Sequence, residues 1–203
     1  MSRPVIVLLT DFGTVDPFVG VMKGAVLTRC PEATLVDLSH EVPPQAVSEG
    51  AFLLERCFRG FPEGSIFVAV VDPGVGTERR ALVVSAHRRS FVGPDNGLLA
   101  ATASLDPEAQ AFVIDPNRLG LVVPSHTFHG RDVFAPVAAE LAAGRLAAAD
   151  VGVRTLDLSP DDRPVSVRRV DRVEGVVVTV DRFGNLITNI DGAAALSLPD
   201  PIV

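Results

Sequence analysis

Residues 65–79 read Ser-Ile-Phe-Val-Ala-Val-Val-Asp-Pro-Gly-Val-Gly-Thr-Glu-Arg, a continuous apolar run followed by a glycine-rich loop. The apolar run at 66–71 is typical of a strand with both faces buried, as in the middle of a parallel sheet. Asp72 begins the loop at the carboxyl end of this strand, where open α/β sheets bind their ligands. Asp72 and Arg79 can meet across the loop and orient a small polar species. An ordinary salt bridge within a loop is an equally good interpretation of this stretch alone.

Strands alternate with helices along residues 1–157, which predicts an α/β domain with a layered, mainly parallel sheet and flanking helices. Asp16 is expected to cap the first helix, with Pro17 in the first helical position. Two further helices are expected after the turn at residues 93–97 and after residue 132. The remaining expected elements are strands at 5–9, 34–38, 66–71, 81–85, 90–92 and 111–114, and a helix at 46–58.

The composition changes in the last quarter of the chain. Residues 158–172 are rich in Pro, Asp and Arg and are expected to form a linker. Residues 173–203 are expected to begin a smaller all-β domain, because a hairpin pattern spans residues 175–190. A single hairpin cannot bury a core of its own. The second domain is therefore expected to be truncated or to lean on a neighbour.

Charge and composition argue against several classes of partner. The net charge is −7 and the chain has neither Trp nor Tyr, which disfavours binding to nucleic acid. Cys30 and Cys57 fit no metal-ligand spacing and favour reduced thiols in a cytoplasmic protein. No apolar run is long enough to span a bilayer, and no signal peptide precedes Val5. We therefore expect a cytoplasmic protein without a membrane or nucleic-acid partner.

Polar groups recur in loops at the ends of the expected strands and of the hairpin. The motifs in these loops together resemble those of the S-adenosyl-L-methionine hydroxide adenosyltransferases, which are relatives of the fluorinating and chlorinating enzymes. The resemblance covers almost the whole chain, with the motifs in the same order. The five motifs are Thr10-Asp-Phe-Gly13, Val71-Asp-Pro-Gly-Val-Gly-Thr77, Gly93-Pro-Asp-Asn-Gly97, Thr127-Phe-His-Gly-Arg-Asp132 and Asp181-Arg-Phe-Gly-Asn185.

The resemblance implies an enzyme in which water or hydroxide attacks C5′ of S-adenosyl-L-methionine, displaces methionine and leaves adenosine. It implies no cofactor and no metal, and a homotrimer whose sites lie between subunits. The catalytic triad of the family falls on Asp72, Arg79 and His129. The substrate-binding positions fall on Asp11 for the ribose, Asp16 and Asp181 near the methionine amino group, Phe183 and Asn185 for adenine, and Phe128 beside the catalytic histidine.

The residue types suit this chemistry. A sulfonium leaves as a neutral thioether, so the reaction needs neither a general acid nor a metal. The difficult partner is the nucleophile, because the pKa of free water is ~15.7. Arg79 can stabilise developing hydroxide, while Asp72 or His129 can orient the water or accept its proton. Asp72 also disfavours halogenation, since the halogenating relatives carry Tyr and Ser-type residues at this position and at His129-Gly130.

Two other functional interpretations stay open at this point. The short C-terminal region is compatible with a protein that binds a nucleoside or S-adenosyl-L-methionine without turnover. Acids at strand tips also suggest, more distantly, a phosphatase or another metal-dependent hydrolase. His40 and His126 match no motif and are expected to be structural.

Overall fold

The computed structural model of the chain describes residues 3–198. The chain forms two compact units that divide after Asp161. The first unit contains the large sheet and the first four of the five motifs. The second unit contains the hairpin and the fifth motif.

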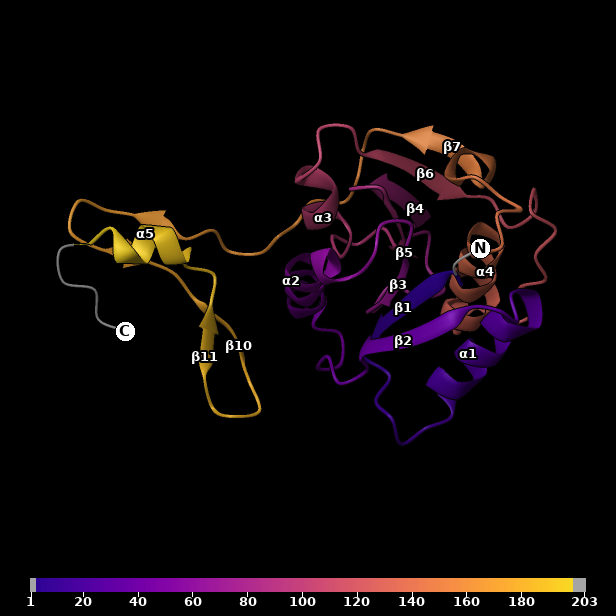
Figure 1. Cartoon of the computed structure of the whole chain (residues 1–203), viewed down its shortest axis with the longest axis horizontal. Coiled ribbons are helices and arrows are strands. Elements are labelled where there is room, and N and C mark those ends of the chain that lie inside the picture. The colour runs from indigo at the N-terminus through magenta and orange to yellow at the C-terminus, as the bar shows by residue number, and fades with distance from the viewer. Residues whose placement is uncertain (1–2, 199–203) are drawn as a thin grey trace. The chain divides into compact units, whose positions relative to one another are not determined.

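The strands described in the first unit form a seven-stranded sheet with the order β2-β1-β3-β5-β4-β6-β7 (Figure 1). The apolar run of the opening stretch becomes β3, near the middle of this order. The strands are β1 (Val5–Thr10), β2 (Thr34–Ser39), β3 (Ile66–Val70), β4 (Ala81–Ala86), β5 (Arg89–Pro94), β6 (Gln110–Ile114) and β7 (Gly152–Thr155).

The direction of the strands changes halfway across the sheet. Strands β2, β1, β3 and β5 are parallel, whereas β4, β6 and β7 pair in antiparallel fashion. The change arises at a two-residue turn between β4 and β5, where His87 and Arg88 have φ angles of 51° and 57°. Two consecutive left-handed residues are typical of a tight hairpin turn. The α/β class is confirmed, with three parallel and three antiparallel pairings within this seven-stranded sheet.

Helices cover both faces of the sheet. α1 (Phe18–Arg29) and α4 (Ala135–Ala142) lie against one face, and α2 (Val47–Cys57) and α3 (Ala100–Ser104) lie against the other (Figure 1). Shorter helical turns complete the unit: η1 (Phe58–Gly60), η2 (Gly130–Phe134) and η3 (Ala148–Asp150). The layers therefore bury the central strands on both sides.

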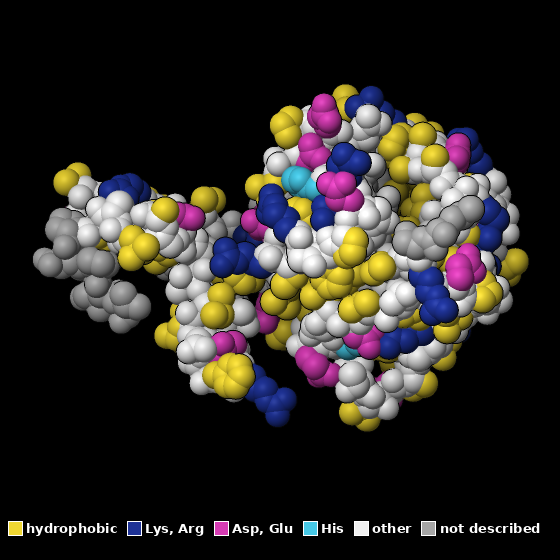
Figure 2. All heavy atoms as spheres, viewed as in Figure 1, with side chains coloured by type: hydrophobic (Ala, Val, Ile, Leu, Met, Phe, Trp, Pro, Cys, Tyr) yellow, Lys and Arg dark blue, Asp and Glu magenta, His cyan; other side chains and the backbone are white. Residues whose placement is uncertain are grey.

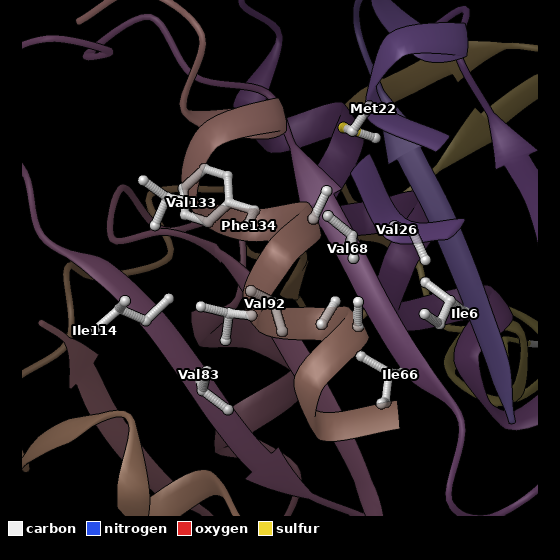
Figure 3. Close-up of a cluster of buried hydrophobic side chains, with 14 of the residues drawn as sticks. Ile6, Met22, Val26, Ile66, Val68, Val83, Val92, Ile114, Val133 and Phe134 are labelled. Carbon is white, nitrogen blue, oxygen red and sulfur yellow. The ribbon is translucent and has the colours of Figure 1, made fainter. Parts of the chain in front are cut away.

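Strand β3 contributes to both hydrophobic clusters. Ile66 and Val68 point to the α1 and α4 side, where they pack with Met22 and Phe134 (Figure 3). Phe67 points to the opposite side, into the cluster under α2 and α3. All five residues of β3 are buried, as the apolar run predicts. Full burial of such a side chain contributes about 1.5–3 kcal/mol, so the strand that precedes Asp72 is firmly held.

The start of α1 differs from the prediction. The helix begins at Phe18, and Pro17 occupies the capping position with φ −74° and ψ 0°. No side chain caps the first turn, because the proline ring has no acceptor to offer the free backbone N–H groups. The prediction that Asp16 caps this helix is therefore wrong. Asp16 lies exposed in the preceding loop.

The second unit is built from small pieces. The predicted hairpin is present, with β10 (Val177–Val180) antiparallel to β11 (Leu186–Thr188). β8 (Val167–Arg168), inside the expected linker, pairs with β9 (Val173–Glu174). α5 (Gly192–Leu196) adds a helical turn to the expected strands, and Asp191 caps it by accepting a hydrogen bond from the backbone of Ala194. None of the hydrophobic side chains described in this unit is fully buried.

The surface carries charges of both signs. Dark blue basic and magenta acidic side chains are interspersed on the face of the first unit shown in Figure 2. Cys30 and Cys57 are both free thiols, and Cys30 is buried at the end of α1. Across residues 3–198, no helix is both long enough and apolar enough to cross a membrane.

Candidate active site

The loop from Asp72 to Arg79, here called the Asp72–Arg79 loop, closes on itself through an ion pair. Arg79 Nε donates to both carboxylate oxygens of Asp72, at 2.9 and 3.1 Å, and Arg79 Nη2 also donates to Asp72 Oδ2. The two side chains are 9% and 5% exposed. Burial and two-pronged geometry make this pair far more rigid than a surface salt bridge.

His129 joins the ion pair from a distant part of the chain. Arg79 Nη2 lies 2.8 Å from His129 Nδ1. Because a guanidinium can only donate, Nδ1 must accept this bond, and the proton of the neutral ring is then on Nε2. Burial lowers the pKa of His129, and the positive charge of Arg79 lowers it further. His129 is therefore a neutral imidazole with a free Nε2–H near neutral pH.

The local fold around Gly130 places His129. Residues Gly130–Phe134 form a π-helical turn directly after His129, a feature that often marks functional sites. A Cβ on Gly130 would lie 3.2 Å from Met22 Sδ and 3.3 Å from the ring of Phe12, so a larger residue would push the turn away. Phe134, at the end of the turn, makes a cation–π contact with Arg79, and its ring centre lies 5.3 Å from the guanidinium carbon.

Gly76 brings the Asp72–Arg79 loop against the segment that precedes His129. Gly76 has a φ of +80°, and a Cβ there would lie 2.7 Å from the carbonyl oxygen of His126. Both its conformation and its close contact therefore require glycine. This contact accounts for Gly76 in the second motif.

A pocket of about 500 Å³ opens at the carboxyl ends of β1 and β3. One wall consists of three edge-to-face rings, Phe12, Phe18 and Phe128, with centroids 5.5–6.2 Å apart. The size and the mixture of apolar and polar groups suit a small-molecule ligand. The lining residues are Asp11, Phe12, Phe18, Val70, Asp72, Val75, Ser125, Thr127, Phe128, His129, Gly130 and Arg131.

Asp11 is held at the rim of this pocket by the neighbouring loops. Its Oδ2 accepts a hydrogen bond of 2.9 Å from the backbone of Gln45, a residue with a φ of +65°. His40 supports the same loop, since its Nδ1 lies 2.8 Å from the hydroxyl of Thr10 and its carbonyl accepts from Gly13. His40 therefore supports the loop that carries Asp11.

The structure brings together five of the predicted site residues. Asp11, Asp72, Phe128 and His129 line one pocket, and Arg79 bonds to two of them. Asp16 does not line this pocket. Within the part of the chain that the structure describes, no group of three or more His, Cys, Asp or Glu residues is placed to hold a metal ion.

The remaining predicted residues form the hairpin turn of the second unit. Asp181 Oδ1 accepts from the backbone of Phe183 and Asn185, and Oδ2 accepts from the Asn185 side chain at 2.7 Å. These bonds, with that from the Asn185 side chain the strongest, hold the pKa of Asp181 below its usual value. Phe183 is 89% exposed. Asp181 and Asn185 thus shape the turn, and the binding roles of all three residues stay predictions.

Comparison with known proteins connects this site to a family. A family model described as "SAM hydroxide adenosyltransferase N-terminal domain" matches residues 6–152. The chain belongs to this family. The matched range includes the pocket, the Asp72–Arg79 loop and His129, so the family relationship rests on the unit that carries these groups.

Individual relatives agree with this assignment to the SAM hydroxide adenosyltransferases. The (R)-S-adenosyl-L-methionine hydrolase of Thermus thermophilus is 43% identical over 93% of this chain and 74% of its own length. The enzyme of the same name from Salinispora arenicola is 44% identical over 98% of this chain and 76% of its own length. A solved structure of an uncharacterised conserved protein from Thermotoga maritima matches with a TM-score of 0.86 and 41% identity, covering 91% of this chain and 71% of that one.

A fluorinase is a more distant relative. The fluorinase of Actinoplanes sp. is 29% identical over 93% of this chain and 72% of its own length. This identity is lower than the 43% and 44% identity to the two hydrolases. The Gly93–Gly97 motif lines no part of the pocket, and its sequence alone indicates neither a catalytic nor a binding role.

Proposed function

We propose that the chain is a hydrolase that cleaves S-adenosyl-L-methionine to adenosine and L-methionine. The observation that carries the proposal is the Asp72–Arg79–His129 network beside the pocket. It occurs in a chain that is 43–44% identical to two relatives named (R)-S-adenosyl-L-methionine hydrolase. The prefix in those names makes the (R) epimer at sulfur the first substrate to test.

The network supports a role for two donors in holding the nucleophile. Arg79 supplies a fixed positive charge, and neutral His129 supplies the Nε2–H that remains after Nδ1 accepts from Arg79. Both favour hydroxide over water at a point close to them. Asp72 is engaged by two nitrogens of Arg79, so its role in this proposal is to fix the direction of the guanidinium.

The reaction balances without a proton donor. Hydroxide oxygen forms a bond to C5′ of the ribose while the C5′–S bond breaks, and its electron pair stays on sulfur. The sulfonium cation and the hydroxide anion are consumed together, and both products are neutral at the reacting atoms. Holding the two reactants in line can lower the barrier by about 7–11 kcal/mol at best.

The other site residues are proposed to bind the substrate. Asp11, fixed at the pocket rim by Gln45, would accept hydrogen bonds from the ribose hydroxyls. Phe128 would form part of the apolar wall next to the reacting carbon. The family motifs support three further roles, with Asp16 and Asp181 near the methionine amino group, Phe183 stacking on adenine, and Asn185 bonding to the adenine edge.

Product analysis tests this function directly. We expect the purified protein to convert S-adenosyl-L-methionine to equal amounts of adenosine and methionine, without added metal and equally well in EDTA. The two sulfonium epimers are assayed separately, with chromatography for adenosine. Substrate binding without adenosine would instead support the binding-protein interpretation. Loss of activity in EDTA that a divalent ion restores would support a metal-dependent hydrolase.

We also propose a homotrimer in which the hairpin turn of one subunit completes the pocket of the next. The family motifs support this, and so does the exposure of Phe183 on a unit without buried hydrophobic side chains in its described part. A mixture of His129→Ala and Asn185→Ala chains should then regain activity, because some shared sites carry neither change. Sedimentation velocity gives the assembly state. A monomer, or no recovery after proven subunit exchange, would rule out shared sites.

A further inference from the structure

The Gly93–Gly97 motif contacts the residues that flank the Asp72–Arg79 loop on either side. At the first end, the Asn96 side-chain amide donates a hydrogen bond of 2.8 Å to the carbonyl oxygen of Val71. Val71 is the residue immediately before Asp72. The same Asn96 side chain accepts from the backbone of Leu98, which fixes the orientation of its amide.

Asp95 makes the corresponding contacts at the other end of the loop. Its backbone N–H donates to the carbonyl oxygen of Arg80 at 2.9 Å, and its Oδ2 accepts from Arg80 Nε at 2.7 Å. Arg80 is the residue immediately after Arg79. The same Arg80 carbonyl also accepts a bond of 3.4 Å from Arg79 Nη1. One carbonyl group therefore connects Asp95 to the guanidinium that contacts Asp72 and His129.

The motif is itself fixed from its far side. Asp95 Oδ1 accepts from the backbone of Ser159 at 2.8 Å, and the Ser159 hydroxyl donates to the Asp95 carbonyl at 3.0 Å. Gly97 has a φ of +95°, and a Cβ there would lie 2.5 Å from the carbonyl oxygen of Pro160. The Asp95 side chain is 4% exposed, so its charge is committed to these partners.

We propose that Asp95 and Asn96 are positioning residues that clamp the two ends of the Asp72–Arg79 loop. The clamp keeps the Asp72 carboxylate and the Arg79 guanidinium in register with His129, which comes from a different part of the chain. Neither Asp95 nor Asn96 lines the pocket, so both act through the loop rather than on the substrate. This inference rests on the proposed hydrolase function for its kinetic readout, but not for its spectroscopic one.

Two isosteric variants test the Asp95–Arg80 contact and the Asn96–Val71 contact separately. Asp95→Asn removes the charge that holds Arg80 and keeps the size of the side chain. Asn96→Asp replaces the donor to the Val71 carbonyl with an acceptor and keeps the acceptor for Leu98. The matched control is Asp106→Asn. Asp106 also accepts backbone hydrogen bonds, from His87 and Glu108, but contacts no part of the Asp72–Arg79 loop.

The expected result has a kinetic and a spectroscopic part. Each clamp variant should lower kcat by about 10- to 100-fold with little change in KM, because a small misplacement at a reacting centre costs rate. Arg79 lowers the pKa of His129 by more than Asp72 raises it. Loosening that pair should therefore raise the pKa of His129, measured by NMR titration of its imidazole. The Asp106→Asn control should keep the wild-type kcat and the wild-type His129 pKa.

The readouts separate failure of the clamp from failure of the proposed function. If wild-type protein forms no adenosine, the function is wrong, and the His129 titration still tests the clamp. Folded Asp95→Asn and Asn96→Asp proteins with wild-type kcat and wild-type His129 pKa would overturn the clamp. If Asp95→Asn does not fold, Asn96→Asp alone decides, since it leaves the buried Asp95–Arg80 pair intact.

Discussion

Replacing Arg79 with Lys should lower kcat by about 10²–10³-fold, the largest effect that we expect from any conservative substitution in this chain. Lys keeps the positive charge but cannot bond Asp72 through two nitrogens and His129 through a third N–H at once. The measurement is steady-state formation of adenosine. Arg79→Lys is preferable to Arg79→Ala, which would leave a carboxylate that is 5% exposed without its partner and would cost about 3–5 kcal/mol of stability.

Arg145→Lys is the matched control for this substitution. Arg145 also pairs with a carboxylate, from its Nε to Glu140 Oε2 at 2.6 Å, but on the exposed surface. We expect this control to keep wild-type kcat and nearly all of its stability. If Arg79→Lys folds and turns over as fast as the control, the fork of hydrogen bonds around Arg79 has no part in catalysis.

Removing the His129 imidazole should change both the rate and its dependence on pH. In the wild type, His129 accepts from Arg79 only when it is neutral, so protonation breaks the network. Its pKa lies below the usual value of about 6.5, so kcat should fall only as the pH drops through that lowered pKa. His129→Ala should lose about 10²-fold in kcat. It should also lose this fall in kcat at acidic pH, which is the acid limb of the pH–rate profile.

His126→Ala is the corresponding control, since His126 is an exposed histidine three residues earlier that does not line the pocket. The control should keep the rate and should still show an acid limb, moved slightly toward higher pH, because charge on His126 is among the causes that lower the pKa of His129. An unchanged acid limb in a folded His129→Ala protein would assign the limb to another group and remove His129 from the account. The direction of the limb matters as well, because activity that rises on acidification would require protonated His129.

The sequence predicts the centre of this molecule better than its edges. The run at 66–71 has only one good solution, a strand buried on both faces, and β3 has that environment. β7 was not predicted, because Val153 and Arg154 are exposed on an edge strand and give no apolar pattern. α5 was missed for a similar reason, as a short alanine-rich turn whose only local signal is the cap at Asp191.

In the active site too, contacts within one loop are predictable from the sequence, whereas contacts between distant segments are not. The Asp72–Arg79 pair follows from a loop that folds back on itself, and reasoning from local sequence predicts it. The contact of Arg79 with His129 spans 50 residues and depends on where the π-helical turn begins. Only the resemblance to a family could indicate it beforehand. The hydrogen bond of Asn96 to Val71 depends on the register of β5 beside β3, and no local pattern encodes that register. The bonds of Asp95 to Arg80 depend on the register of β5 beside β4.

The most direct test of the account is the fate of solvent oxygen during turnover. The reaction is run in heavy-oxygen water, and both products are analysed by mass spectrometry. Hydroxide attack at C5′ predicts one heavy oxygen in adenosine, located on the 5′-hydroxyl, and none in methionine. Unlabelled adenosine would contradict the account. So would cleavage on the methionine side of sulfur, with methylthioadenosine as product and the heavy oxygen in the amino acid.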